Sequence, residues 1–392
     1  IQPLNFQFKE HFISVAHNGN LVNTCELRRE YEQAGQMFTT TTDTEIIAKI
    51  LIEEITASGC VEDAVHLCMK RMQGSYSVVI MIDGVIYAFR DPLGIKPFCL
   101  GKIENGYIVA SESVAIDALN GKFLRDVKPG ELIRMDSEGV RCTQIAVAGR
   151  RAHCIFEYIY FARADAVMDG VLVYDVRRAI GQQLHEEAPV KADSVGSVPD
   201  SGTAYAIGYA ERSRIPFVES LMKNRYMGRT FIMPTQQARE RAVRIKLNPI
   251  PGHLKDKSVV LVDDSIVRGT TSKRIIEMMR DAGAREVHMR IGSPAIKAPC
   301  YLGVDMPTRE ELIASNRIEE EVRRSITATT LHHISLDALV EAIGFDREDL
   351  CTGCLTGCYP VPIDGEIANP RQVDFVDGTF QSKLESFEAG TT

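Results

Sequence analysis

The first part of the chain carries the hydrophobic pattern of paired strands. From about residue 12 to residue 145, short apolar runs alternate with turn residues. Residues 78–82 and 85–89 are two such runs, separated only by Asp83 and Gly84. An Asp-Gly pair between apolar runs is the pattern of a tight β-hairpin. This part of the chain therefore predicts antiparallel strands.

Two helices are expected to cover these strands. Residues 24–34 and 44–55 carry apolar side chains at helical spacing. Asp43 or Thr44 is a plausible N-cap of the second helix, because short polar side chains accept the free N–H groups of a first turn. We therefore expect an α+β unit of antiparallel sheets and helices.

After about residue 152 the pattern changes to alternating strands and helices, which is typical of an α/β fold with a parallel sheet. Strands are expected at residues 194–198, 258–263 and 286–291, and helices at 203–213, 310–315, 318–324 and 336–343. A chain of 392 residues is long enough for about two domains.

Composition narrows the class of protein. Hydrophobic residues make up 45% and charged residues 25% of the chain, as in ordinary globular proteins. The net charge of −8 argues against a general nucleic-acid surface. No apolar run approaches the roughly 18–20 residues that cross a bilayer, and no signal peptide is visible. We expect a cytoplasmic protein with no nucleic-acid or membrane partner.

One stretch suggests a sugar-phosphate site. The apolar run 258–263 ends in two adjacent carboxylates and is followed by a polar, glycine-containing loop, with a helix expected from Ser272. Such a loop presents N–H groups and a helix N-terminus to an anion, while the carboxylates suit ribose hydroxyls and a divalent cation. The residues concerned are Asp263, Asp264, Ser265, Arg268, Gly269, Thr270 and Thr271.

A second candidate anion loop follows the strand expected at residues 194–198. It consists of Pro199, Asp200, Ser201 and Gly202, a combination typical of a tight turn with converging N–H groups. Alone it would be an unremarkable turn. Two such loops in one sheet suggest a ligand with phosphate at both ends.

The segment from Lys223 to Lys246 is basic, with seven Lys or Arg residues and one Glu in an otherwise acidic chain. A solvated charged face is one interpretation. A clamp on a pyrophosphate is the other, and the neighbouring anion loops favour it. Gly228 would let such a segment fold over a ligand as a lid.

Three further features have both a chemical and a structural interpretation. Asn18 and Gly19 end an expected strand and could form an oxyanion hole, or an ordinary Asn-Gly turn. Asp43 could bind a substrate amine, or only cap a helix. The cluster of Cys351, Cys354 and Cys358 suggests metal or redox chemistry, although thiols in a loop can also gather by chance.

Taken in order, the motifs resemble those of the glutamine phosphoribosylpyrophosphate amidotransferases, or amidophosphoribosyltransferases. The resemblance covers nearly the whole chain. The segments that carry it are residues 16–23, 90–97, 154–163, 198–202, 223–226, the Asp263-Asp264 loop and residues 305–308.

This resemblance implies two domains and a tail. Residues 1–147 would form an N-terminal-nucleophile glutaminase domain of stacked antiparallel sheets. Residues 148–350 would form a type I phosphoribosyltransferase domain with a parallel sheet, and residues 351–392 a cysteine-containing tail. The family's nucleophilic N-terminal Cys should precede Ile1 by several tens of residues, so we expect the glutaminase domain to be truncated here.

The resemblance also assigns roles to residues. Asn18 and Gly19 match the family's oxyanion hole, and Asp43 its glutamine-binding Asp. Ser201, Asp263 and Asp264 match its Mg²⁺ positions. Residues 268–271 match the 5′-phosphate loop, and Lys223 and Arg229 match the flexible loop that closes on the diphosphate. In the iron–sulfur branch of the family, a [4Fe-4S] cluster would be held by Cys154, Cys300, Cys351 and Cys354; by residue type, zinc could use the same four.

The implied activity forms 5-phosphoribosylamine and pyrophosphate from 5-phosphoribosyl 1-pyrophosphate (PRPP) and ammonia derived from glutamine. This is the first step of de novo purine nucleotide synthesis. The family also implies a homotetramer and feedback inhibition by purine nucleotides. A non-catalytic PRPP sensor and an iron–sulfur redox protein are the alternatives on the same fold.

Overall fold

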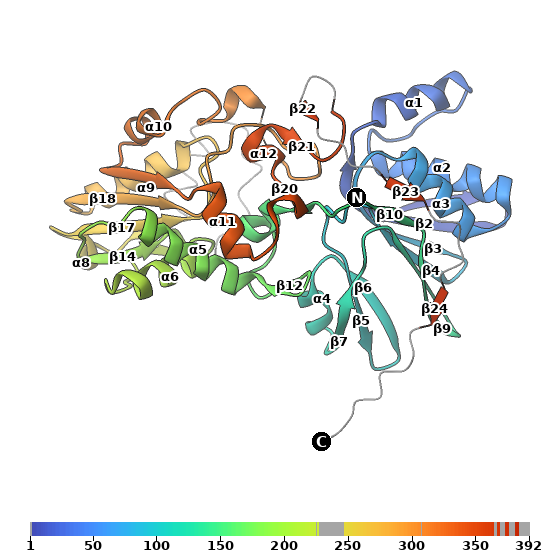
Figure 1. Cartoon of the computed structure of the whole chain (residues 1–392), viewed down its shortest axis with the longest axis horizontal. Coiled ribbons are helices and arrows are strands. Elements are labelled where there is room, and N and C mark those ends of the chain that lie inside the picture. The colour runs from blue at the N-terminus through green and yellow to red at the C-terminus, as the bar shows by residue number, and fades with distance from the viewer. Residues whose placement is uncertain are drawn as a thin grey trace.

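The computed structural model describes residues 2–224, 226, 247–306 and 308–363, and the backbone of three short strands beyond them. The first half contains a seven-stranded antiparallel sheet in the order β1-β2-β3-β4-β8-β9-β24 (Figure 1). Its strands are β1 (Leu4–Phe8), β2 (His11–Leu21), β3 (Gly74–Ile82), β4 (Val85–Arg90), β8 (Glu131–Asp136), β9 (Gly139–Gln144) and β24 (Gln381–Lys383). The expected hairpin is confirmed, since β3 and β4 pair and the turn residues Asp83 and Gly84 both have positive φ.

Helices cover one face of this sheet and a smaller sheet covers the other. Apolar side chains of α2 (Asp43–Ser58) and α3 (Val61–Arg71) pack on the inward side chains of β2 and β3. The opposite face packs against the three-stranded sheet β6-β5-β7. The other elements here are α1 (Thr24–Gln33), β5 (Cys99–Ile103), β6 (Gly106–Ala110), α4 (Ser113–Asp117) and β7 (Lys122–Asp126). Stacked antiparallel sheets were expected.

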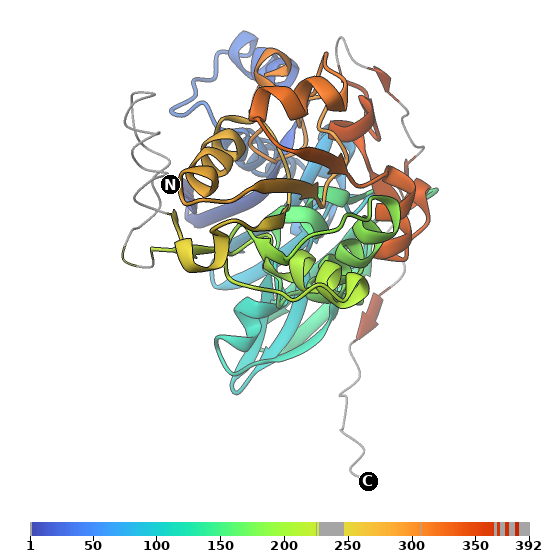
Figure 2. The same ribbon diagram turned by 90° about the vertical axis from the view of Figure 1, so that its left-hand side faces the viewer.

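The second half is built on a four-stranded parallel sheet in the order β14-β17-β18-β19. Both of its faces are covered (Figure 2). In β17, Val260 and Val262 pack in the core with α5, α6 and α11, whereas Val259 and Leu261 pack with α9 and α10. The elements are α5 (Val173–Glu187), β14 (Ser194–Ser197), α6 (Thr203–Ser213), β17 (Ser258–Asp263), α9 (Thr270–Asp281), β18 (Glu286–Ile291), α10 (Glu319–Ile326), β19 (Thr330–His333) and α11 (Leu336–Ile343).

Short elements connect the two halves and the tail. The tail strand β23 pairs with β10, and β24 pairs with β9, so the described part of the tail returns to the first half. These elements are β10 (Ala146–Ala148), β11 (His153–Cys154), η1 (Glu157–Phe161), β12 (Val167–Met168), β13 (Val171–Leu172), β15 (Leu221–Lys223), β16 (Leu247–Pro249), α8 (Pro251–Leu254), η2 (Arg309–Glu311), η3 (Arg347–Asp349), β20 (Leu350–Cys351), α12 (Gly353–Thr356), β21 (Cys358–Tyr359), β22 (Ile367–Ala368) and β23 (Val373–Phe375). In the described part of the chain, no helix is both long and apolar enough to span a membrane.

Some local predictions were wrong. The helix expected at residues 310–315 is only the short 3-10 turn η2. Helix α9 begins at Thr270 rather than Ser272, because Gly269 takes a left-handed conformation (φ 76°) at the N-cap and lets the chain turn into the helix two residues earlier. Neither Asp43 nor Thr44 is the N-cap of α2, because the helix already begins at Asp43 after Thr42. The domain boundaries after residues 147 and 350 stay predictions.

Candidate functional site

The two predicted anion loops lie side by side. They follow β14 and β17, which are neighbouring parallel strands and therefore end at the same edge of the sheet. The Val198 N–H donates to the Val262 carbonyl at 2.9 Å. Gly202 sits so close that a Cβ there would lie 2.4 Å from the same carbonyl oxygen. Adjacent loops of this kind at a sheet's carboxyl edge form a ligand crevice.

The two carboxylates of the second loop are buried and close together. Asp263 is 7% exposed and Asp264 is 5% exposed. The Asp264 N–H donates to Asp263 Oδ1 at 3.0 Å, and Ser265 Oγ donates to Asp264 Oδ2 at 2.6 Å. Burial raises the pKa of Asp263 well above its usual value, and the charge of Asp264 adds to it. No Lys or Arg forms an ion pair with either carboxylate among the residues that the structure describes, so a divalent cation would relieve the repulsion.

The start of α9 is arranged to receive an anion. Thr270 and Thr271 are exposed and lie in the first helical turn, where backbone N–H groups have no intrahelical partner. Arg268, next to them, is held by Glu311 at 3.2 Å. Together with the helix dipole these groups suit a phosphate. The correction of the helix start strengthens this prediction, because it places both hydroxyls at the N-terminus itself.

Of the predicted basic clamp, only its beginning can be placed. Lys223 ends β15 and forms an ion pair with Asp200, so it reaches the first anion loop. Arg229 and the rest of the basic segment up to Lys246 lie outside the described residues. Ser201 is in the same loop and is partly buried.

Asn18 and Gly19 do not form a turn, because both lie within β2, which continues to Leu21. The turn interpretation was therefore wrong, as was the expected strand end. Asn18 Nδ2 donates to Ser111 Oγ at 2.9 Å. A Cβ on Gly19 would lie 2.0 Å from the Ser75 carbonyl oxygen, so this position requires glycine.

Asp43 faces the same strand. Its Oδ2 accepts the Leu21 N–H at 3.1 Å, and its Oδ1 lies 3.5 Å from Nδ1 of His17. Burial by itself would raise the pKa of Asp43, but the hydrogen bond and charge of His17, together with the backbone N–H groups of Leu21 and Thr44, lower it overall. Asp43 is therefore an ionised carboxylate that these contacts fix in position near Asn18 and Gly19. Such a carboxylate suits the ammonium group of a ligand. His17 was missed by the sequence analysis, and only its place next to Asn18 could have suggested it.

The four predicted cysteine ligands are free thiols that come together from three segments: Cys154, Cys300 and the Cys351–Cys354 pair. Cys154 and Cys351 are register partners in the parallel pair β11–β20. Lys297 and Ala298, just before Cys300, both donate N–H groups to the Cys354 carbonyl. Burial and the charges of the other three thiols raise the pKa of Cys354 well above its usual value.

The two metal interpretations differ in the spacing that they require of these thiols. Among the described residues, no three His, Cys, Asp or Glu side chains are grouped to hold a single metal ion. In a four-iron cluster each thiolate binds a different iron atom, so the sulfurs lie further apart than the ligands of one zinc ion. Cys154, Cys351 and Cys354 are buried and Cys300 is partly buried; whether they hold a cluster or zinc stays a prediction.

A buried ion pair beside these cysteines was also missed. Lys96 pairs with Glu157, and their side chains are 0% and 4% exposed. Lys96 lies in the 90–97 motif. Another residue of this motif, Arg90, has a structural role: its guanidinium donates to Asp169 Oδ1 at 2.9 Å and to three backbone carbonyls. Through Arg90–Asp169 and Lys96–Glu157 the motif joins the two halves.

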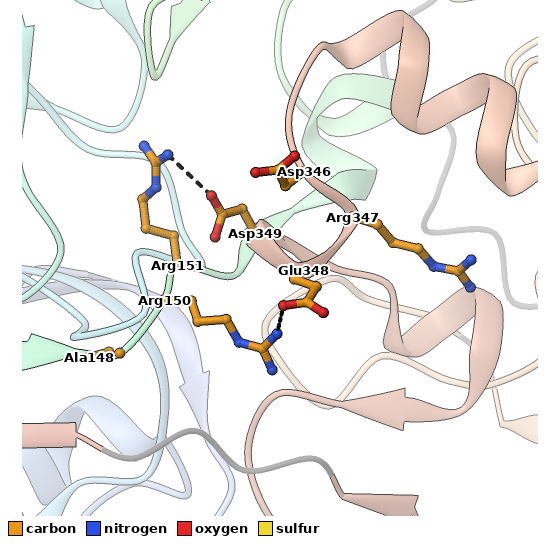
Figure 3. A pocket seen from close by; sticks show the side chains of 8 residues that line it. Ala148, Arg150, Arg151, Asp346, Arg347, Glu348 and Asp349 are labelled. Atoms are coloured by element: carbon orange, nitrogen blue, oxygen red, sulfur yellow. Dashed lines mark hydrogen bonds and ion pairs between the residues drawn. The ribbon is translucent and has the colours of Figure 1, made fainter.

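A surface pocket of about 640 Å³ lies between the end of β10 and the segment that leads to Cys351 (Figure 3). Two ion pairs lie within its lining: Arg150 pairs with Glu348, and Arg151 with Asp349 at 3.2 Å. None of the predicted site residues lines it.

The fold and these loops define a class: a glutamine-amidotransferase-type phosphoribosyltransferase. Residues 1–118 match the family described as a glutamine amidotransferase domain. An amidophosphoribosyltransferase of Archaeoglobus fulgidus is 50% identical over 367 residues, or 93% of this chain and 80% of the relative. That of Methanocaldococcus jannaschii is 47% identical over 90% of this chain and 78% of the relative.

A solved structure agrees with these sequence matches. The B. subtilis glutamine PRPP amidotransferase complexed with ADP and GMP superposes with a TM-score of 0.87 at 42% identity, over 94% of this chain and 82% of that chain. The chain belongs to the amidophosphoribosyltransferase family. The predicted activity, the first step of purine nucleotide synthesis, is thereby confirmed, and the sensor and redox alternatives are not supported.

Proposed function

We propose that PRPP binds across the two adjacent loops that follow β14 and β17. The observation that carries this proposal is their contact at one sheet edge, through the Val198–Val262 hydrogen bond and the close approach of Gly202. The N-terminus of α9, with Arg268 to Thr271, would hold the 5′-phosphate. Residues 199–202 would hold the diphosphate, with Lys223 and Arg229 as its cations.

In the transfer, ammonia attacks the anomeric carbon of the ribose while the bond to pyrophosphate breaks. Positive charge grows on the ring, and negative charge grows on the leaving diphosphate. Asp263 and Asp264 would accept the ribose hydroxyls near the growing positive charge, and Lys223 would face the leaving group. The step needs no protein nucleophile.

Mg²⁺ is the metal that we assign to Ser201, Asp263 and Asp264, and when bound it would neutralise diphosphate oxygens. The two buried carboxylates without a cationic partner among the described residues support it. A [4Fe-4S] cluster is assigned to Cys154, Cys300, Cys351 and Cys354 on their convergence. A cluster could supply redox or structural chemistry; in either case the chain's contribution is four thiolates and the nearby Lys96 ammonium.

The ammonia would come from glutamine in the first half. Asn18 and Gly19 would stabilise the oxyanion formed when the amide carbonyl is attacked. Asp43 would bind the amino group of glutamine, since its ionised carboxylate lies near them.

Three further assignments extend from the family. Purine nucleotides would act as feedback inhibitors, as the ADP and GMP bound to the B. subtilis enzyme suggest. A homotetramer is the assembly we propose. All ten cysteines are unpaired, which supports a cytoplasmic location with reduced thiols.

The test is pyrophosphate release from PRPP, first with ammonia and then with glutamine. We expect ammonia-dependent release that requires Mg²⁺ and is lost in Asp264→Asn. Release that persists in this variant would contradict the assignment. Iron and sulfide analysis with visible absorbance tests the cluster: about four irons per chain are expected, with loss in Cys351→Ser.

A further inference from the structure

A loop of the second half lies directly against the strand that carries the proposed oxyanion hole. Residues 300–304 follow β18, and two hydrogen bonds join them to the first half. Asn20 Nδ2 donates to the Tyr301 carbonyl at 2.8 Å, and the buried Ser75 Oγ donates to the Leu302 carbonyl at 2.8 Å. Both bonds come from one cross-strand pair beside Gly19: Asn20 is its chain neighbour, and Ser75 is the register partner of Asn20 on strand β3.

Next to these bonds, Gly19 and Gly303 are in close backbone contact. A Cβ on Gly303 would lie 3.0 Å from both Cα and the carbonyl carbon of Gly19. On its other side, a Cβ on Gly19 would lie 2.0 Å from the Ser75 carbonyl oxygen. The Gly19 backbone is therefore held between β3 and the loop: Gly19 has no room for a side chain, and a Cβ on Gly303 would force a small shift of Gly19 or of the loop.

The loop itself is firmly placed. Leu302 is 2% and Val304 is 6% exposed, and the Leu302 N–H donates to Cys300 Sγ at 3.3 Å. Gly303 has φ +97°, a conformation that an L side chain rarely adopts. A contact this close between two rigid backbones transmits a small displacement instead of absorbing it.

We propose that residues 301–303 position the glutaminase oxyanion hole by fixing the backbone of Gly19, and that Gly303 is the specific positioning residue. This inference rests on the proposed role of Asn18 and Gly19. An oxyanion donor must be held within about 0.5 Å of its working position, and loss of one donor costs about 10²–10³ in kcat. The second half of the chain would thus determine amide cleavage in the first.

The test is Gly303→Ala in enzyme that carries the family's N-terminal Cys. The added methyl group must displace Gly19 or the loop, so glutamine-dependent kcat should fall at least about tenfold with little change in the KM for glutamine. Ammonia-dependent turnover should be unchanged, because the PRPP loops are not touched. In the 392-residue chain, amide hydrogen exchange of residues 18–21 should become faster.

Gly344→Ala is the matched control. Gly344 also has a positive φ (82°), but a Cβ there would meet nothing within 4 Å. It carries the same backbone strain without the contact, and should leave both activities unchanged. Asn20→Ala is a milder second variant, in case Gly303→Ala does not fold. It removes the bond to the Tyr301 carbonyl and the longer one, at 3.5 Å, to the neighbouring Leu21 carbonyl. Its loss of turnover should also be confined to glutamine.

Three results would overturn the inference. Unchanged glutamine-dependent turnover in both Gly303→Ala and Asn20→Ala would show that residues 301–303 do not position the oxyanion hole. Equal losses with glutamine and ammonia, or an equal loss in Gly344→Ala, would show a general structural effect. If the unsubstituted enzyme used ammonia but not glutamine, the assignment of Asn18 and Gly19 would itself fail, and the inference with it.

Discussion

Lys96 and Glu157 form an ion pair between the two halves of the chain, and neither side chain is more than 4% exposed. Burial alone would lower the pKa of Lys96. The charge of Glu157, together with those of Cys154 and Cys300, outweighs it and raises the pKa, so the lysine stays charged. The pair is therefore part of the contact between the two halves and lies next to two of the proposed cluster ligands.

Replacing only the lysine should be strongly destabilising. In Lys96→Met, Glu157 would be left buried without its partner, which typically costs about 3–5 kcal/mol. The free energy of unfolding, measured by urea denaturation under anaerobic conditions, should fall by this amount. The double variant Lys96→Met/Glu157→Leu should recover most of the loss, because no charge is left unpaired. A double variant as unstable as the single one would show that packing, not charge, explains the loss.

The sequence predicted much of this molecule because its signals are local. The Asp83-Gly84 hairpin, the helix at residues 336–343 and the strands that precede the two predicted anion loops each depend on a few adjacent residues, and the structure contains all of them. Lys96–Glu157 and Gly19–Gly303 were not predictable, since each joins positions far apart in the chain and neither has a distinctive local pattern. Asn18 and Gly19 show the same limit: the turn interpretation failed because Asn20 pairs with Ser75, 55 residues later, and the strand stays extended.

Asp263→Asn should raise stability while removing activity. It takes away one of two buried, mutually repelling carboxylates, and the amide oxygen can still accept the Asp264 N–H. We expect a gain of about 1 kcal/mol in the absence of Mg²⁺, and an ammonia-dependent rate at least about 100-fold lower. Thermal melts in a chelating buffer and a pyrophosphate assay measure the two effects. The exposed Asp117 supplies the control, because Asp117→Asn should change neither quantity.

Gly202→Ala should weaken substrate binding at the contact of the two loops. Gly202 has an ordinary φ of −75°, so alanine adds no backbone strain. Its Cβ would, however, lie 2.4 Å from the Val262 carbonyl oxygen and 2.9 Å from that of Val198. Separating the loops should raise the KM for PRPP at least about tenfold and cost about 1–3 kcal/mol of stability. Gly252→Ala, where a Cβ meets nothing within 4 Å, should be neutral in both assays; an unchanged KM in Gly202→Ala would contradict a ligand that spans the loops.

His332 should give the fold a stability that depends on pH. Its Nε2 lies 3.0 Å from Glu187 Oε2, and its Nδ1 lies 3.7 Å from Glu319 Oε1. The hydrogen bond to Glu319, with that to Glu187, raises the pKa of His332 against the effect of burial. A raised folded-state pKa means that the charged form stabilises the fold. This contribution is fully present below the unfolded-state pKa of about 6.5, and it is lost as the pH rises through the folded-state pKa.

His332→Gln should therefore lower the free energy of unfolding more at pH 6 than at pH 9. Because both ion pairs are partly exposed, we expect a difference of about 0.5–1 kcal/mol between the two pH values. Urea denaturation at each pH measures it, with both glutamates ionised throughout. His253→Gln is the control, because the His253 ring contacts the Glu219 carbonyl instead of a carboxylate; its effect should be the same at both pH values. An equal effect of His332→Gln at pH 6 and pH 9 would mean that the imidazole stabilises the fold through packing and not through its charge.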